Sequence, residues 1–332
     1  MRALRALFHL LILTGLTTLT GLSLLGAEPL APNRSWDLTL PIDGQKIDIR
    51  VRAPTNATTA CPVIIFSHGL GGSREGYWPL AEAWASAGFV VIQPSHPGSD
   101  TQTLKDAGIL GMGAAARKAM ADPNICVGRP RLVTRIIDLI PTIQTRLEGF
   151  HGTLDATRIG VSGHSFGAWT TLAVAGVGYV LPGHGPLSDP RPLAFLALSP
   201  PGPGQVPADA TAAPRPTLVM TGTEDHQPAL LSPHDGIEHD WKWREQTWRL
   251  LPAGNAFLAV LANAHHSAFS AGQGARLSGD PQPEPWMGPA LDAITITWWR
   301  AHLLHDATAL ACLENGSVVP LADRSRVRWE KR

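Results

Sequence analysis

Short apolar runs recur along the chain, and between them apolar residues return at helical spacing. Continuous apolar runs of this length are typical of strands buried on both faces of a parallel sheet. They occupy 62–67, 89–92, 159–161, 193–198, 217–221 and 257–261, and we expect the last to be the final strand. Helical spacing follows at 77–85, 131–147, 168–177, 241–250 and 289–304. This alternation predicts an α/β fold with a mostly parallel central sheet flanked by helices.

Two segments depart from this rhythm. Residues 36–52 alternate between apolar and polar around Asp43-Gly44, which predicts a β-hairpin. Residues 95–128 are rich in glycine and alanine and interrupt the strand–helix order. We interpret 95–128 as an inserted loop, a lid or wall of a pocket, because loops at a sheet edge build sites in such folds. A surface excursion without a role is the alternative.

The N-terminal residues 1–27 carry the features of a secretory signal. Arg2 and Arg5 precede an apolar stretch over 7–25, and Ala27 offers a small residue for cleavage. We therefore expect a signal peptide at 1–27, one catalytic domain over 28–332, and a secreted or periplasmic protein. An uncleaved membrane anchor is the alternative, since the apolar stretch is just long enough to span a bilayer.

The composition of the chain bears on nucleic-acid binding, metal binding and disulfide formation. Basic and acidic residues number 27 each, so the net charge is zero and nothing favours nucleic acid as a partner. The three cysteines, Cys61, Cys126 and Cys312, contain no C-x-x-C pair, which argues against a structural zinc site. In an exported protein two of them would form a disulfide if the geometry allowed, and the sequence does not choose the pair.

The strongest chemical signal is the segment Gly163-His164-Ser165-Phe166-Gly167. It matches G-x-S-x-G and lies between an apolar strand and an apolar helix, the setting of a nucleophile elbow. Ser165 would then be a nucleophile, and the N–H of Phe166, at the helix start, would help to hold an oxyanion. A glycine-rich structural turn is the alternative interpretation.

A serine nucleophile needs a base and a group that orients the base. Asp225 follows the apolar run at 217–221, with Glu224 as its close rival. His265 and His266 follow the run at 257–261, and we favour His266 as the base. The order Ser165, Asp225, His266 is the order of the α/β-hydrolase triad. A second oxyanion donor is expected in the glycine-rich segment 68–72, where the N–H of Leu70 is the candidate.

These motifs resemble those of a known family. The segments 66–72 and 163–167 are similar to the two motifs of platelet-activating-factor acetylhydrolases, within a group of α/β-hydrolases that includes dienelactone-hydrolase-like esterases and bacterial polyester hydrolases. The resemblance covers roughly residues 60–270. It implies Ser165 as nucleophile and the N–H groups of Leu70 and Phe166 as the oxyanion hole.

The chain also departs from the acetylhydrolase pattern. In the platelet-type enzymes the acid follows the strand after the elbow, and here 199–202 holds no carboxylate. The segments 217–225 and 263–266 instead resemble bacterial polyester hydrolases, which implies Asp225 as acid and His266 as base. This departure weakens the case for phospholipid specificity.

We therefore expect a secreted serine hydrolase that cleaves short-chain carboxylic esters. A lipase, phospholipase or polyester hydrolase acting on longer or polymeric esters is the alternative, and a non-catalytic binding protein on a hydrolase fold is the alternative of another class. A peptidase of this fold usually needs a further domain. The expected ester hydrolysis implies no cofactor. We expect no metal site, because the histidines and acids between 225 and 240 match no standard ligand spacing.

Overall fold

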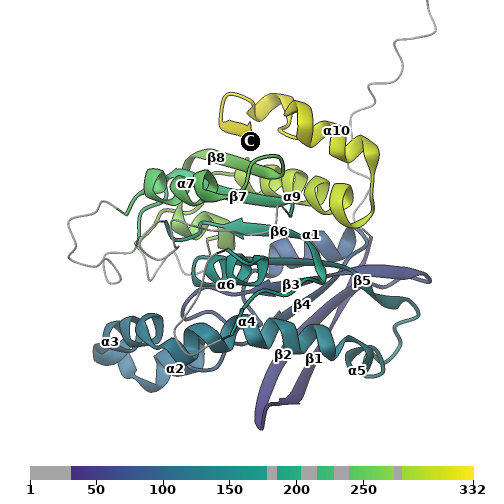
Figure 1. Ribbon diagram of the computed structural model, residues 1–332, viewed down its shortest axis with the longest axis vertical. Helices are drawn as coiled ribbons and strands as arrows, with labels where there is room; N and C mark the ends of the chain where they lie inside the picture. The colour runs from purple at the N-terminus through teal and green to yellow at the C-terminus, as the bar shows by residue number, and fades with distance from the viewer. Residues whose placement is uncertain (1–30, 178–184, 203–214, 228–238, 273–278) are drawn as a thin grey trace, which may run out of the picture. The chain divides into compact units, whose positions relative to one another are not determined.

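A nine-stranded sheet runs through the described part of the chain (Figure 1). The structure is a computed structural model that describes residues 31–177, 185–202, 215–227, 239–272 and 279–332. The predicted signal peptide at 1–27 lies outside these residues. The strands are β1 (Asn33–Ile42), β2 (Gln45–Pro54), β3 (Ala60–Ser67), β4 (Val90–Pro94), β5 (Thr153–His164), β6 (Pro192–Leu198), β7 (Thr217–Glu224), β8 (Ala256–His265) and β9 (Val327–Lys331).

The sheet is mostly parallel, as the alternation of runs predicts. Its strand order is β1-β2-β4-β3-β5-β6-β7-β8-β9. The six strands from β4 to β8 in this order pair in parallel, while β1, β2 and β9 pair antiparallel at the two edges. The carboxyl ends of the parallel strands therefore meet at one edge, where α/β folds build their sites.

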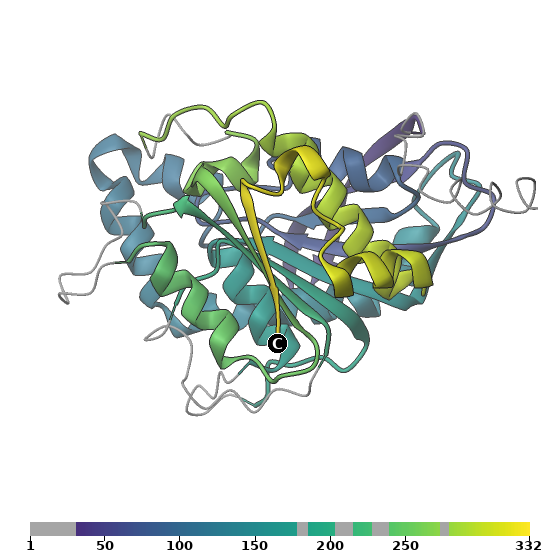
Figure 2. The ribbon, with the colours of Figure 1, turned by 90° about the horizontal axis from the view of Figure 1, so that it is seen from above.

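Helices cover both faces of this sheet (Figures 1 and 2). They are α1 (Trp78–Ser86), α2 (Thr101–Asp106), α3 (Gly108–Ala121), α4 (Pro123–Asp138), α5 (Ile140–Gln144), α6 (Phe166–Ala175), α7 (Trp241–Leu250), α9 (Met287–Leu303) and α10 (Ala307–Asn315), with short 3₁₀ turns η2 (His266–Ser270) and η3 (Leu321–Asp323). Along β3, Val63 and Ile65 join one core with α4 to α7, and Ile64 and Phe66 join the other with α1, α9 and α10. Alternate side chains of a strand point to opposite faces, so one apolar run supplies both cores.

The predicted hairpin is confirmed. β1 and β2 pair antiparallel from Asn33↔Pro54 to Ile42↔Gln45. The two turn residues, Asp43 and Gly44, have φ of 48° and 79°. Two successive positive φ values are what a type I′ turn requires, and Asp-Gly is a favoured sequence for it.

Residues 95–128 are not a loop, and this part of the prediction is wrong. The segment holds α2, α3 and the first turns of α4. Asp100 caps α2 by accepting a hydrogen bond from the N–H of Thr103, and Asp122 caps α4 in the same way from Asn124. The glycines and alanines that suggested a loop lie mostly in α3, which forms without a side-chain cap because alanine is the strongest helix former. The capping aspartates mark the starts of α2 and α4 instead.

The C-terminal part of the predicted domain holds two elements that the sequence pattern did not predict. The runs at 257–261 and 289–304 correspond to β8 and α9, but neither ends the domain, because α10 and β9 follow. β9 pairs antiparallel with β8 and covers its outer edge. Its sequence, Val-Arg-Trp-Glu-Lys, is short and charged, which suits an edge strand and hides it from a search for apolar runs.

The expected disulfide does not form, since all three cysteines are free. Cys61 lies in the core that α4 to α7 cover, and Cys312 packs against the core on the other face of the sheet. Cys126 packs into a third, small cluster beside α6. The fold therefore distributes the three thiols among separate apolar environments.

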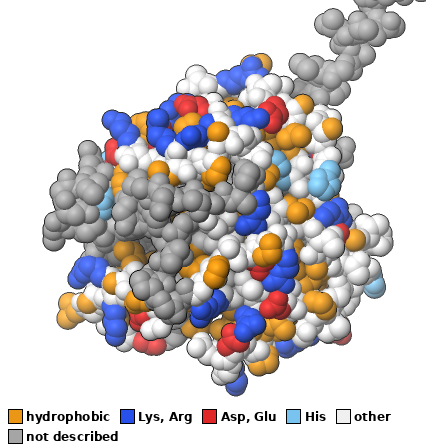
Figure 3. Space-filling model, viewed as in Figure 1, with side chains coloured by type: hydrophobic (Ala, Val, Ile, Leu, Met, Phe, Trp, Pro, Cys, Tyr) orange, Lys and Arg blue, Asp and Glu red, His pale blue; other side chains and the backbone are white. Residues whose placement is uncertain are grey.

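Two observations on the described residues bear on possible partners: the distribution of charge on one face and the character of the helices. Basic and acidic side chains are interspersed on the face shown in Figure 3. Within the residues that the structure covers, no helix combines the length and the apolar character needed to cross a membrane.

Candidate active site

Ser165 occupies a strained turn between β5 and α6. Its φ and ψ are 55° and −118°, a conformation that a non-glycine residue rarely adopts. A Cβ on Gly163 would lie 2.3 Å from the Gly167 carbonyl oxygen, and one on Gly167 would lie 1.9 Å from the Ser67 oxygen. Both flanking glycines are thus required by close backbone packing. The residue is partly exposed, so its hydroxyl is accessible at the carboxyl edge of the sheet.

Asp225 and His266 form a hydrogen-bonded pair. The Nδ1 atom of His266 lies 2.8 Å from Oδ1 of Asp225, which is fully buried. Thr221 donates to the other carboxylate oxygen at 2.9 Å, and Nε of Arg244 lies 3.0 Å from Oδ1. Burial alone would raise the pKa of Asp225, but the Arg244 guanidinium and His266 outweigh it and hold the pKa well below its usual range. The carboxylate is therefore ionised and oriented toward the imidazole.

The two rival residues lie apart from this pair. Glu224 is exposed at the end of β7, and its carboxylate lies 3.8 Å from Nε2 of the exposed His226. His265 is the last residue of β8, directly opposite Glu224 in the sheet register. The alternation of side chains along a strand separates neighbours, so the pairs 224/265 and 225/266 have different surroundings.

Ser199, at the end of β6, also faces His266. Its Oγ lies 2.7 Å from His266 Nδ1. This is the position after the strand that follows the elbow, where the sequence holds no carboxylate. The ends of β6 and β7 therefore both reach the same nitrogen, which explains how the carboxylate can follow β7 in this chain.

A network of buried polar side chains ties the elbow to its surroundings. The N–H of Gly69 donates to the Tyr77 hydroxyl at 3.1 Å, and that hydroxyl lies 2.8 Å from Nδ1 of His164. Nε2 of His164 donates to the His266 carbonyl at 3.0 Å. Burial lowers the pKa of His164 well below its usual value, so the ring is neutral, with its proton on Nε2. One histidine thus connects the glycine-rich loop, the elbow and the loop that carries His266.

Two backbone N–H groups are left free beside the elbow. The glycine-rich loop is fixed by Gly71, whose N–H donates to Ser99 O at 2.9 Å, and by Gly69 as above. Between them, the N–H of Leu70 has no acceptor among the described residues, and the N–H of Phe166 at the start of α6 has none either. Hydrogen bonds of the neighbouring residues hold the backbone on either side of each group.

The Ser165 hydroxyl makes no hydrogen bond in the part of the chain that the structure describes. The link between this hydroxyl and His266 is thus the one contact of the expected triad that is not made. Such bonds are often long in the absence of substrate and tighten when it binds. His164, next to Ser165 in the chain, has its ring centroid 4.6 Å from that of His266, so His266 lies close to the elbow.

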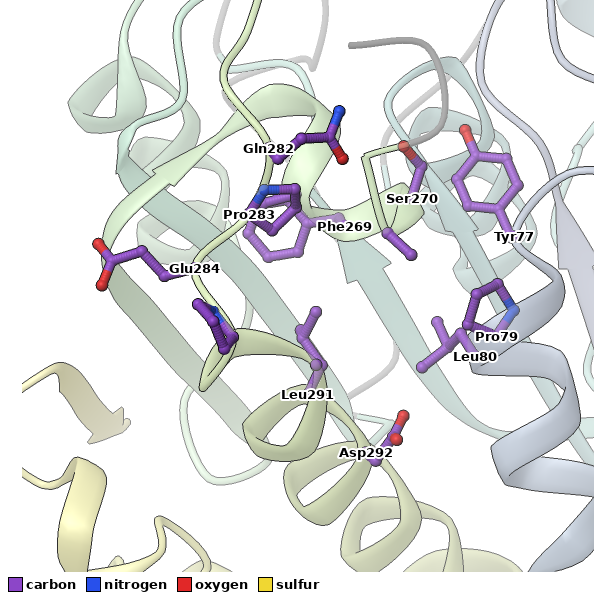
Figure 4. A pocket seen from close by; sticks show the side chains of 14 residues that line it. Tyr77, Pro79, Leu80, Phe269, Ser270, Gln282, Pro283, Glu284, Leu291 and Asp292 are labelled. Atoms are coloured by element: carbon purple, nitrogen blue, oxygen red, sulfur yellow. The ribbon is translucent and has the colours of Figure 1, made fainter.

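A pocket of about 290 Å³ lies beside this network (Figure 4). The start of α1, the turn η2, residues 282–285 and the start of α9 enclose it, and Tyr77 and Phe269 face into it. Burial raises the pKa of Asp292 in its wall to about 6. Tyr77 therefore borders the pocket with its ring and the network with its hydroxyl.

Sequence reasoning missed four residues of this arrangement: Tyr77, His164, Ser199 and Arg244. His164 lies inside the elbow motif, so the sequence indicates its position but not its hydrogen bonds to Tyr77 and His266. The others come from three separate elements, and no spacing in the sequence connects them to Ser165. Within the described ranges no group of side chains could hold a metal ion, while His234, Asp235 and Glu238 of the acidic and histidine-rich segment lie outside those ranges.

Part of the chain matches a known protein family. A family model described as platelet-activating factor acetylhydrolase, isoform II, matches residues 34–106, from the first strand to α2. This range includes the glycine-rich loop at 68–72 and ends before the elbow. No curated protein matches the chain. Over residues 34–106 the chain is therefore similar to the platelet-activating factor acetylhydrolases, and its fold is that of an α/β-hydrolase.

Proposed function

We propose that this protein is a serine hydrolase that cleaves carboxylic esters with short acyl groups. The observation that carries the proposal is the strained conformation of Ser165 in the sheet of an α/β-hydrolase fold. The hydrogen-bonded pair of Asp225 and His266 follows β7 and β8 at the same edge of that sheet. The similarity to acetylhydrolases supports an ester substrate and a small acyl group. We also propose that the chain is secreted or periplasmic, from the character of residues 1–27.

In the proposed reaction Ser165 Oγ attacks the ester carbonyl carbon. Nε2 of His266 accepts the serine proton, and Asp225 stabilises the imidazolium through the bond at Nδ1. The carbonyl oxygen becomes an oxyanion held by the N–H groups of Leu70 and Phe166. When the tetrahedral intermediate collapses, His266 returns the proton to the leaving alcohol, and an acyl-enzyme remains.

The acyl-enzyme is then hydrolysed by the same groups. Water attacks the acyl carbon while His266 accepts one of its protons, and the oxyanion again occupies the same two N–H groups. Collapse breaks the bond to Ser165 Oγ, which regains the proton from His266. The products are one acid and one alcohol, so the residues named suffice for the reaction.

The test is hydrolysis of p-nitrophenyl esters from acetate to palmitate by wild type and Ser165→Ala. We expect a maximum at short chains and a fall in kcat/KM of about 10⁴-fold or more in the variant. Ser162→Ala is the matched control, because Ser162 lies on β5 three residues earlier and bonds to Leu196 O. It should lose some stability and keep its activity.

Other outcomes identify the alternatives. Maximal activity on esters with long acyl chains would contradict the short-chain hypothesis and favour a lipase or polyester hydrolase. Equal inertness of wild type and variant toward every ester, together with no labelling of Ser165 by a fluorophosphonate, would contradict a catalytic role and favour a binding protein.

A further inference from the structure

Arg129 of α4 lies buried against the glycine-rich loop at 68–72, called the oxyanion loop below, with 1% of its surface exposed. Its Nε donates to Oγ1 of Thr170 at 2.9 Å and its Nη1 to Oγ of Ser99 at 2.7 Å. Its Nη2 donates to the carbonyl oxygen of His68. The guanidinium carbon lies 4.5 Å from the ring centroid of Phe166. One side chain therefore joins the oxyanion loop, the segment after β4, and the helix that follows the elbow.

This cation has no carboxylate partner within 4 Å among the residues that the structure describes. Burial lowers the pKa of Arg129 to about 9, so the group still carries its charge at neutral pH. A buried charge without a counter-ion is costly, and stability alone does not account for it. Its partners are carbonyl and hydroxyl oxygens and one aromatic face, which orient the charge without neutralising it.

The contacts of Arg129 are to residues that adjoin the two free N–H groups in the chain or bind their neighbours. His68, whose carbonyl it binds, is two residues before Leu70. Ser99, whose hydroxyl it binds, accepts the N–H of Gly71 through its carbonyl on the other side of Leu70. Phe166, against whose ring it packs, carries the second N–H. A shift of this arginine would thus move both donors.

We propose that Arg129 is a positioning residue for the oxyanion hole, which holds the N–H groups of Leu70 and Phe166 in place and adds a positive charge behind them. The proposal rests on the proposed function. A charge in this dry environment favours an oxyanion more than it would in water. It also gives the helical segment after β4 a role, because α4 carries the arginine to the site as fixed scaffold.

Arg129→Met and Arg129→Lys test the proposal through the split between kcat and KM on p-nitrophenyl acetate. Methionine fills the space without charge or donors, and kcat should fall about 10²-fold with KM changed less than about threefold, as for loss of an oxyanion donor. Lysine keeps the charge but cannot make the forked contacts, so kcat should recover in part, to about tenfold above methionine. A methionine variant with wild-type kcat would overturn the proposal.

Arg215→Met is the matched control. Arg215 also donates to carbonyl oxygens, those of Asp189 and Ala175, and its guanidinium carbon lies 4.6 Å from the Phe195 ring centroid. These contacts lie at the end of α6 remote from Ser165. The control should lose stability and keep kcat within about twofold. An equal fall of kcat in the 129 and 215 methionine variants would show a merely structural role and overturn the proposal.

Hydrogen exchange separates this proposal from the proposed function. The amides of Gly69 and Gly71 are bonded on either side of Leu70, and they should exchange faster in Arg129→Met than in Arg215→Met, whether or not the protein hydrolyses esters. Unchanged exchange at both amides would contradict positioning. If the wild type hydrolyses no ester but these amides exchange faster in Arg129→Met, the proposed function is contradicted and the positioning of the loop by Arg129 is not.

If Arg129→Met does not fold, single contacts can be removed. Thr170→Val and Ser99→Ala each delete one hydroxyl that accepts from the guanidinium. Each should lower kcat by about three- to tenfold and leave KM nearly unchanged. Wild-type kcat in both folded variants would count against the proposal.

Discussion

At the scale of single residues, the site depends on a buried ion pair that the sequence did not indicate. Asp225 and Arg244 have 0% and 2% of their surfaces exposed. Arg244 also donates to the carbonyl oxygens of Ser199 and Pro200. The same arginine therefore fixes the acid and the loop after β6, and the carboxylate is shared between a cation and the imidazole of His266.

We predict that Asp225→Asn lowers kcat about 10⁴-fold and destabilises the fold by about 3–5 kcal/mol, because it leaves the Arg244 charge buried and unpaired. The pKa of Asp225 is depressed in the folded state. Its contribution to stability is therefore full above the unfolded pKa of about 3.9 and is lost as the pH falls toward the folded pKa. Urea unfolding and ester kinetics measure the two effects.

The double variant Asp225→Asn/Arg244→Met is the control for this prediction. Removing the second charge should restore much of the stability, since replacing both members of a buried pair by neutral groups is often tolerated. It should not restore kcat. Recovery of activity in the double variant would show that Asp225 acts only by neutralising Arg244.

At the scale of elements, the turn at Ser165 depends on the close approach of β3, β5 and α6. Gly163 and Gly167 face one another across the turn, and Gly167 lies against the end of β3 at Ser67. The spacing of the motif is thus a packing requirement. The serine conformation follows from it, because the chain must reverse from strand to helix within one residue.

Gly167→Ala should lower kcat by about 10²-fold or more and destabilise the protein, because its Cβ would lie 1.9 Å from a backbone oxygen that cannot rotate away. Gly128→Ala is the control: this helical glycine has no atom within 4 Å of an added Cβ. It should keep its activity and gain up to about 1 kcal/mol. Thermal unfolding and kinetics of both variants give the answer, and an active, stable Gly167→Ala would contradict the packing argument.

At the scale of the whole molecule, the sheet topology gathers buried histidines around the site. His68 follows β3, His96 follows β4 and His164 ends β5, and all three are buried. Nε2 of the His96 ring lies 3.1 Å from Ser67 Oγ. The backbone N–H of His96 donates to Nε2 of His68. Burial lowers the pKa of His68 to about 3 and those of His96 and His164 well below the usual value.

These histidines should make the fold labile to acid. Each takes up a proton near pH 6.5 when the chain unfolds but not while it is folded, so the unfolded state binds more protons and stability falls as the pH drops below about 6.5. Each contributes about 1.4 kcal/mol per pH unit until its folded pKa is reached. Urea unfolding between pH 5 and 7.5 measures the slope.

His96→Gln should reduce this slope, and His151→Gln, at an exposed histidine, should leave it unchanged. A wild-type protein whose free energy of unfolding is flat between pH 5 and 6.5 would show that the three rings are protonated in the folded state.

The sequence indicated the parts of the fold that follow from local pattern. Each apolar run at 62–67, 89–92, 193–198 and 217–221 is a strand in the structure. The sequence pattern did not indicate β9, a charged strand whose partner lies at the sheet edge. It also did not indicate the helices between 95 and 128, of which α3 is alanine-rich and uncapped while α2 and α4 begin at capping aspartates. The apolar pattern of a sequence reflects burial. Strands buried on both faces can therefore be recognised from it, whereas elements at the edge of the sheet cannot.

The sequence by itself determined the order of the candidate residues: a serine in a G-x-S-x-G turn, then Asp225, then His266, each just after an apolar run. The tertiary structure decided which atoms meet. It set Asp225 and not Glu224 against His266, brought Ser199 and Arg244 to the same pair, and placed Arg129 against the carbonyl oxygen of His68 in the glycine-rich loop. Motifs record local backbone geometry, whereas contacts between residues far apart in the chain depend on how strands are ordered in the sheet and on which helices cover them.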